Sequence, residues 1–143
     1  MTSWRDSASP QAQGDLDNAL SAGIGAAQDE LAAHGGFYPF SVVVRTDGTT
    51  ELVSALPSDG DDAPQAAELV RSLDSAVADL LPDLRAVAVL SDVAVPDGEA
   101  IQVTLEHAEG QAIAVQLPYS RSPTGKVTFG DLRATGGERR HWH

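Results

Sequence analysis

The amino-acid sequence predicts an α+β fold with two layers, in which two helices cover one face of an antiparallel sheet of about five or six strands. Two segments, about 15–34 and 64–81, repeat apolar residues every three to four positions, which is the period of a helix surface. Other short segments alternate apolar and polar residues between turn signals, which is typical of strands with one buried face. The expected order is α-β-β-α-β-β-β-β, with both helices packed on the sheet.

The first predicted helix follows a polar segment, 1–13, which we expect to be a flexible N-terminal arm. Residues 14–143 are expected to form a single domain of ordinary size, including a C-terminal strand and tail. Asp15 is suited to cap the helix, and Gly35-Gly36 to end it. Gly23 and Gly25 each weaken a helix by about 1 kcal/mol relative to Ala, which favours close packing against another element. The apolar stripe is Leu16, Leu20, Ile24, Ala27 and Leu31.

A β-hairpin is predicted next, from strands at 37–45 and 50–56. Asp47-Gly48 between them is a favoured two-residue hairpin turn. Pro39 lies near the start of the first strand, where it indicates a sheet edge or an entry point.

An acidic loop, 57–63, precedes the second helix. Its aspartates do not have the spacing of an EF-hand calcium loop, so we expect a solvated loop in which Asp62 caps the helix. Pro64 suits the first helical turn and Pro82 ends the helix. The helix stripe is Ala66, Leu69, Val70, Leu73, Ala76, Val77 and Leu80.

Three further strands are predicted at 85–95, 99–107 and 111–119, joined by short turns. Each alternates apolar and polar residues, so we expect an antiparallel meander with one buried face.

Glu106, His107 and Glu109 are residue types that bind zinc or transfer protons. Neighbours on a strand point to opposite faces, so Glu106 and His107 are not expected to share an ion, and Glu109 lies in the turn. We therefore interpret His107 as a hydrogen-bonded residue at the rim of the core. His141 and His143 at the C-terminus are interpreted as part of an end that docks or frays, and the prediction includes no metal, cofactor or catalytic residue.

Several short motifs together resemble those of a group of small bacterial proteins. The motifs are "FYPF" at 37–40, the Asp47-Gly48 turn, Asp92–Val95, "AIQVTLEH" at 100–107, "LPY" at 117–119 and a tail like "GKVTFGDLRATGGERRHW" at 125–142. The resemblance implies that the tail belongs to the domain and adds a strand, and it implies no activity. The order of elements is also similar to the roadblock and longin-like scaffolds, which usually close with a third helix.

The charge and composition of the chain argue against some classes of function. The net charge of −12 divides into −15 for residues 1–119, with four basic and nineteen acidic side chains, and +3 for residues 120–143, with five and two. This balance argues against binding to nucleic acid. Because there is no cysteine, no secretory signal and no apolar run of membrane length, we expect a soluble cytoplasmic protein.

The sequence contains none of the catalytic motifs GxSxG, HExxH or GxxxxGK[ST]. We therefore expect a non-enzymatic protein-binding or regulatory module, and a narrower form is an immunity-type or inhibitor protein that neutralises a basic partner. The alternatives are a homodimeric roadblock-like scaffold, and a small-ligand-binding protein or enzyme with a carboxylate or His107 site. The candidate binding surface comprises Phe37, Tyr38, Phe40, Tyr119, Asp59, Asp61 and Asp62.

Overall fold

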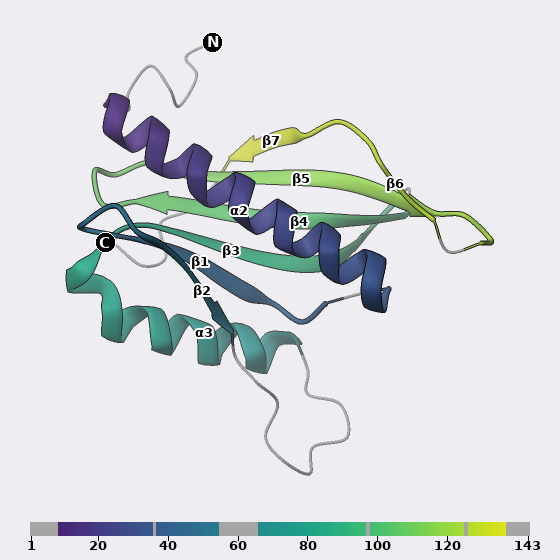
Figure 1. Cartoon of the computed structure of the whole chain (residues 1–143), viewed down its shortest axis with the longest axis horizontal. Coiled ribbons are helices and arrows are strands. Elements are labelled where there is room, and N and C mark those ends of the chain that lie inside the picture. Colours follow the sequence, from purple (N-terminus) through teal and green to yellow (C-terminus); the bar gives the residue numbers. More distant parts are fainter. Residues whose placement is uncertain (1–8, 36, 55–65, 97, 125, 137–143) are drawn as a thin grey trace.

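The computed structural model describes residues 9–35, 37–54, 66–96, 98–124 and 126–136. Within these ranges, two α-helices and seven strands follow one another (Figure 1). The elements are α2 (Pro10–His34), β1 (Phe40–Arg45), β2 (Thr50–Ser54), α3 (Ala66–Leu80), the 3₁₀ turn η1 (Leu81–Asp83), β3 (Leu84–Val95), β4 (Gly98–His107), β5 (Ala112–Arg121), β6 (Val127–Phe129) and β7 (Arg133–Gly136). The prediction of an α+β fold with an antiparallel sheet is confirmed.

The strands form one sheet in the order β2-β1-β3-β4-β5-β6, and every neighbouring pair is antiparallel. The described part of the C-terminal tail contributes two strands rather than one, because β7 also pairs with β5, farther along that strand than β6. The sheet therefore has one strand more than the upper end of the predicted range.

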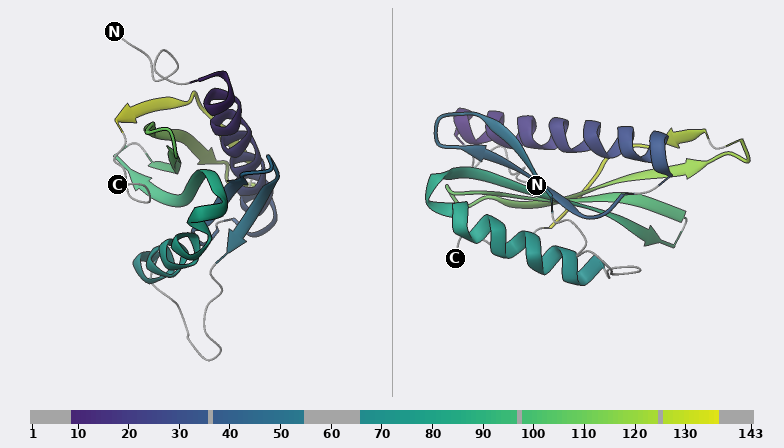
Figure 2. Two further views of the ribbon diagram at one scale, coloured as in Figure 1. Left: turned by 90° about the vertical axis from the view of Figure 1, so that its left-hand side faces the viewer. Right: turned by 60° about the horizontal axis from the view of Figure 1, so that its bottom comes forward.

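The two helices lie on opposite faces of the sheet, so the expectation that both cover one face is wrong (Figure 2). Alternation along β1 shows this directly, because Val42 and Val44 belong to the core beneath α2 while Val43 packs with Val77 of α3. Neighbouring residues of β3 also belong to different cores, since Ala88 lies in the core beneath α2 and Val89 in the core beneath α3. β1 and the first part of β3 are therefore buried on both faces, which explains their nearly continuous apolar sequence.

The larger core lies between α2 and strands β1, β3, β4 and β5. It contains the predicted α2 residues Leu16, Ala27 and Leu31, with Leu20 and Ile24 packed at its margin. The smaller core lies between α3 and the β1–β3 side of the sheet, around Val77. In the described chain, neither helix is long and apolar enough to cross a membrane.

Helix α2 begins at Pro10, so residues 10–13 belong to the helix and not to the predicted arm. Ser9 is the N-cap in place of Asp15, since the Ser9 Oγ accepts a hydrogen bond from the Ala12 N–H. The predicted end is confirmed, because Gly35 takes a left-handed conformation there. The predicted start of α3, including the Asp62 cap and Pro64, lies outside the described residues.

Close packing explains one of the two glycines in α2. A Cβ atom on Gly23 would lie 2.7 Å from Leu90 Cδ1, and Leu90 is fully buried in β3. Nothing lies within 4 Å of the corresponding position on Gly25. Gly23 therefore lets α2 approach the sheet, whereas Gly25 has no such role.

Candidate functional site

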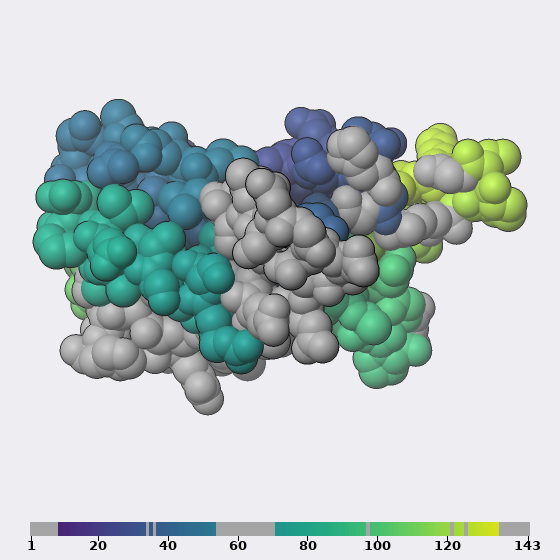
Figure 3. Space-filling model, turned by 90° about the horizontal axis from the view of Figure 1, so that it is seen from below, coloured from purple at the N-terminus to yellow at the C-terminus, as the bar shows by residue number. Residues whose placement is uncertain are grey.

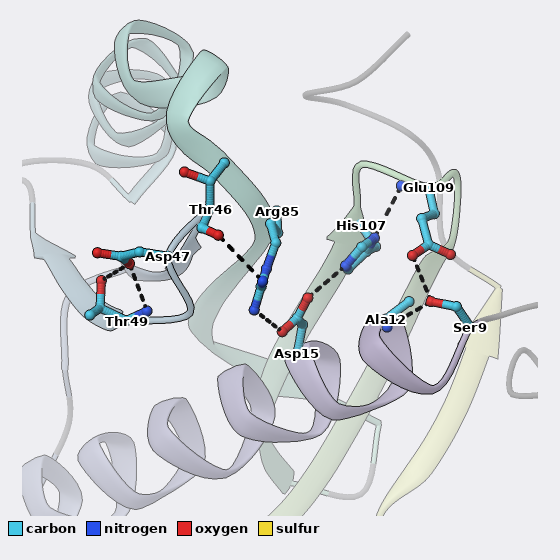
Figure 4. A network of polar contacts seen from close by, with 9 residues as sticks. All are labelled: Ser9, Ala12, Asp15, Thr46, Asp47, Thr49, Arg85, His107 and Glu109. Atoms are coloured by element: carbon cyan, nitrogen blue, oxygen red, sulfur yellow. Dashed lines mark hydrogen bonds and ion pairs between the residues drawn. The ribbon is translucent and has the colours of Figure 1, made fainter.

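A buried polar network joins α2 to the end of the sheet where the β1–β2 and β4–β5 turns lie (Figure 4). Asp15 lies at its centre. This residue is only 4% exposed, which is unusual for an acidic side chain. Arg85 Nη2 in β3 donates to Asp15 Oδ1 at 2.8 Å, and His107 Nε2 in β4 lies 2.9 Å from Asp15 Oδ2. Each carboxylate oxygen therefore has a partner from a different strand, as a buried carboxylate requires.

The hydrogen bonds of His107 define its tautomer. The Glu109 N–H donates to His107 Nδ1 at 3.0 Å, so Nδ1 is the acceptor and the ring proton lies on Nε2, which donates to Asp15. The residue is 2% exposed, and both of its ring nitrogens are occupied. In this arrangement His107 links β4 to α2 through Asp15 and to the β4–β5 turn through Glu109. The expectation of a hydrogen-bonded His107 at the rim of the core is confirmed.

Sequence reasoning missed the role of Asp15 because it assigned the residue to a helix cap. With Ser9 as the cap, Asp15 lies more than one turn inside α2, just before the buried Leu16. The cap is itself part of the network, since Ser9 Oγ donates to a carboxylate oxygen of Glu109 at 2.6 Å. The one sequence signal is the position of Asp15 directly before Leu16 of the apolar stripe, and it does not identify the distant partners Arg85 and His107.

The acidic neighbours of His107 do not join it around an ion. Glu106 is buried on the opposite face of β4, and Glu109 turns toward Ser9. Within the described ranges, no three His, Asp or Glu side chains come together as metal ligands would. Asp59, Asp61, Asp62, His141 and His143 lie outside those ranges, and so does any surface that they form.

The aromatic candidates do not form one exposed surface. Phe40 and Tyr119 are buried in the core beneath α2, so both are core residues and not surface residues. The ring of Phe37 meets that of Phe40 edge to face at 5.6 Å between centroids, and the Tyr119 hydroxyl donates to Asp92. Tyr38 alone among the four is largely exposed, at 54%.

The β1–β2 turn carries its own exposed charges. The loop spans three residues, because Arg45 and Thr49 pair across it and Gly48 has a positive φ of 92°. Hydrogen bonds from the Thr49 N–H and hydroxyl lower the pKa of the Asp47 carboxyl, and an ion pair of 2.8 Å with Arg45 lowers the pKa of Glu51. Both carboxylates therefore remain charged at neutral pH, and their partners Thr49 and Arg45 belong to the same hairpin.

A cleft of about 510 Å³ lies where the β3–β4 turn faces the segment that enters β7. Its volume falls within the range of small-molecule sites, roughly 300 to 1,000 Å³. The polar residues that line it include Glu99, Gln116, Ser120 and Arg133. The cleft therefore combines charges of both signs with the apolar surface of Ala100 and Pro118.

The outer edge of β2 is the other distinctive surface, since β2 ends the sheet and no described strand pairs beyond it. The Arg45 N–H donates to the Thr49 C=O at 2.8 Å, which makes these two residues a hydrogen-bonded pair. Because such pairs alternate, Glu51 and Val53 also bond to β1, while Leu52 directs its N–H and C=O away from β1. Leu52 is 55% exposed, and Figure 3 shows the β1–β2 hairpin at the surface beside α3.

Comparisons of the chain with models of protein families, with curated proteins and with solved structures found no match.

Proposed function

We propose that this chain is a non-enzymatic protein-binding module that accepts an extended segment of a partner at the outer edge of β2. One observation carries the proposal: Leu52 presents a backbone N–H, a backbone C=O and an exposed apolar side chain at the end of the sheet. A partner strand added there forms main-chain hydrogen bonds, while the side chains on alternate positions select its sequence.

The polar network supports a role without catalysis. Asp15, Arg85 and His107 bond to one another at the contact between α2 and the sheet. Using His107 in a reaction requires the loss of its hydrogen bond to Asp15 or to the Glu109 N–H. These two bonds fasten α2 to β4 and to the β4–β5 turn, which supports a structural role for His107.

The negative charge of the molecule favours a partner of opposite charge. The excess of acidic residues in 1–119 supports attraction of a basic protein, including the narrower immunity-type or inhibitor role. The open edge also supports the alternative of a homodimeric scaffold, which uses the same backbone groups.

The test compares two forms of the protein as baits for partners from a cell lysate. Leu52→Pro removes the outward N–H and leaves the hydrogen bonds from β1 to Glu51 and Val53 in place. Partners that bind by strand addition are expected to be captured by the wild type and lost with Leu52→Pro. Tyr38→Ala, which removes an equally exposed apolar side chain outside the sheet, should leave capture unchanged.

Equal capture by the wild type and by Leu52→Pro would show that partners bind elsewhere on the molecule. That result would overturn the proposed role of the β2 edge.

A further inference from the structure

We propose that a second copy of the chain occupies this edge, so that two β2 strands pair antiparallel about a two-fold axis at Leu52. This inference rests on the proposed function, since it names the partner for the same β2 edge. The joined molecule would have one continuous sheet that runs through both copies.

The backbone of β2 is suited to pairing with itself. In the antiparallel arrangement centred on Leu52, the N–H of each Leu52 donates to the C=O of the other, because both groups point outward. Thr50 of one copy then lies opposite Ser54 of the other, and the outward groups of these residues continue the ladder. In a dimer with a two-fold axis, the outward N–H and C=O groups of both strands thus form the same set of hydrogen bonds.

The side chains of β2 are also compatible with this register. Leu52 meets its own equivalent, which covers the apolar surface that is exposed in the single chain. On the other face of the strand, Glu51 lies opposite Val53 of the second copy, so no like charges are directly opposed. Glu51 is held by Arg45 at 2.8 Å in its own chain, which offsets its charge locally.

The described edge strand has only some of the features by which sheets commonly prevent such pairing. Sheet edges are usually protected by a short edge strand, by lysine or other charges, by proline or by a bulge. β2 is short and contains Glu51, but it has no lysine, proline or bulge. The residues of β2 are Thr-Glu-Leu-Val-Ser, and the one register shift in this region lies between β1 and β3, at Val44 and Arg45. The outward-facing centre of β2 is instead a leucine.

Charge predicts how such a dimer responds to salt. Each copy carries a net charge of −12, so two copies repel each other at long range, and salt screens that repulsion. Dimerisation is therefore expected to strengthen as salt rises. A basic partner would show the opposite dependence, because salt screens its attraction to the acidic chain.

The first experiment measures the mass of the purified full chain by sedimentation equilibrium, up to about 1 mM and at low and high salt. A five-residue strand pair buries less than the roughly 1,200 to 2,000 Å² of a stable interface, so the dimer should dissociate on dilution. We expect the mass to rise from 14.9 kDa toward twice that value, more readily at high salt. Leu52→Pro should remain monomeric at every concentration, with unchanged far-UV circular dichroism.

A second experiment tests the register. The chain contains no cysteine, so Leu52→Cys introduces a single thiol. The two Cα atoms of a hydrogen-bonded antiparallel pair lie about 5.5 Å apart, which a disulfide can span. Oxidation should therefore link most of the Leu52→Cys protein into a dimer. Tyr38→Cys and Leu132→Cys, whose parent residues are 54% and 51% exposed, should form few links.

A monomer at all concentrations and salts, or a dimer that survives Leu52→Pro and does not cross-link through Cys at position 52, would overturn this inference. The proposed function is judged separately, by whether Leu52→Pro removes partners captured from a lysate. A strict monomer whose lysate partners depend on Leu52 would thus retain the β2 binding edge and exclude the second copy as its occupant.

Discussion

At the scale of single residues, Asp15 shows how a charge is kept inside this fold. Its carboxylate has two donors from two strands, Arg85 and His107, and its residue is almost completely buried. A buried charge that loses its partner is strongly destabilising, because the desolvation penalty is no longer offset. The stability of the α2–sheet contact should therefore depend on each member of this group.

Asp15→Asn should destabilise the protein by about 2 to 3 kcal/mol, because the substitution leaves the Arg85 guanidinium without its ion pair. The expected loss is moderate because the Arg85 side chain is partly exposed, at 23%. The free energy of unfolding, measured with urea, checks the prediction. Asp29→Asn, at an exposed position of the same helix, is the matched control and should change stability by less than about 0.5 kcal/mol. Equal effects of the two substitutions would contradict the structural role of Asp15.

The two glycines of α2 allow a comparison within one helix. Alanine gains about 1 kcal/mol of helix propensity over glycine at either position. Gly25→Ala should keep that gain, because the added Cβ meets nothing within 4 Å. Gly23→Ala should destabilise the protein by roughly 1 to 2 kcal/mol, because its Cβ collides with buried Leu90. Thermal unfolding of both variants provides the measurement, and a stabilised Gly23→Ala would show that α2 can move away from β3.

Much of this residue-level detail was beyond prediction from the sequence. The apolar period of α2 identified Leu16 and Leu31 as buried, and strand alternation placed His107 on the apolar face. Asp15 resembles an N-cap in sequence, and its two partners are distant along the chain, so no local pattern indicates them. Gly23 and Gly25 are likewise equivalent in sequence, and only the position of Leu90 distinguishes them.

At the scale of elements, strands with clear alternation and short turns were predicted to within a few residues. The three strands of the meander are examples, since β3, β4 and β5 begin at Leu84, Gly98 and Ala112. The helix start was less accurate, because Ser9 and Pro10 form a cap and a first turn within a segment whose composition suggests an arm. In the tail, β6 was predicted, while the short β7 has no apolar alternation to identify it.

The tail strands should be necessary for stability. Truncation after Arg121 removes β6 and β7, two of the three described strands that pair with β5, and the core contacts of Val127 and Phe129. We expect a loss of several kcal/mol, which lowers Tm by roughly 10 °C for a chain of this size. Phe129→Ala should give a smaller loss in the same direction, and Thr128→Ala, at an exposed position, should give almost none. An unchanged Tm after truncation would show that the tail only rests on the sheet.

At the scale of the whole molecule, the sequence patterns predicted the class of fold correctly, but they did not predict that α2 and α3 lie on opposite faces of the sheet. Periodicity tells which face of a helix is buried, but it does not tell on which side of a sheet the helix packs. The informative segments were β1 and β3, where apolar residues such as Val42, Val43 and Val44 follow one another without polar interruption. Such runs need cover on both faces, which two helices on one face cannot supply.

The network at Asp15 also bears on the order in which this chain acquires its structure. The two side chains that bond to the Asp15 carboxylate follow it by 70 and 92 residues. During synthesis α2 leaves the ribosome before β3 and β4, so its buried carboxylate lacks both partners until these strands have been made and paired. Contacts between such distant segments form slowly, because the intervening chain must first be closed into a loop. Helix α2 is thus made before β3 and β4, and its docking through Asp15 is completed only after both strands are in place.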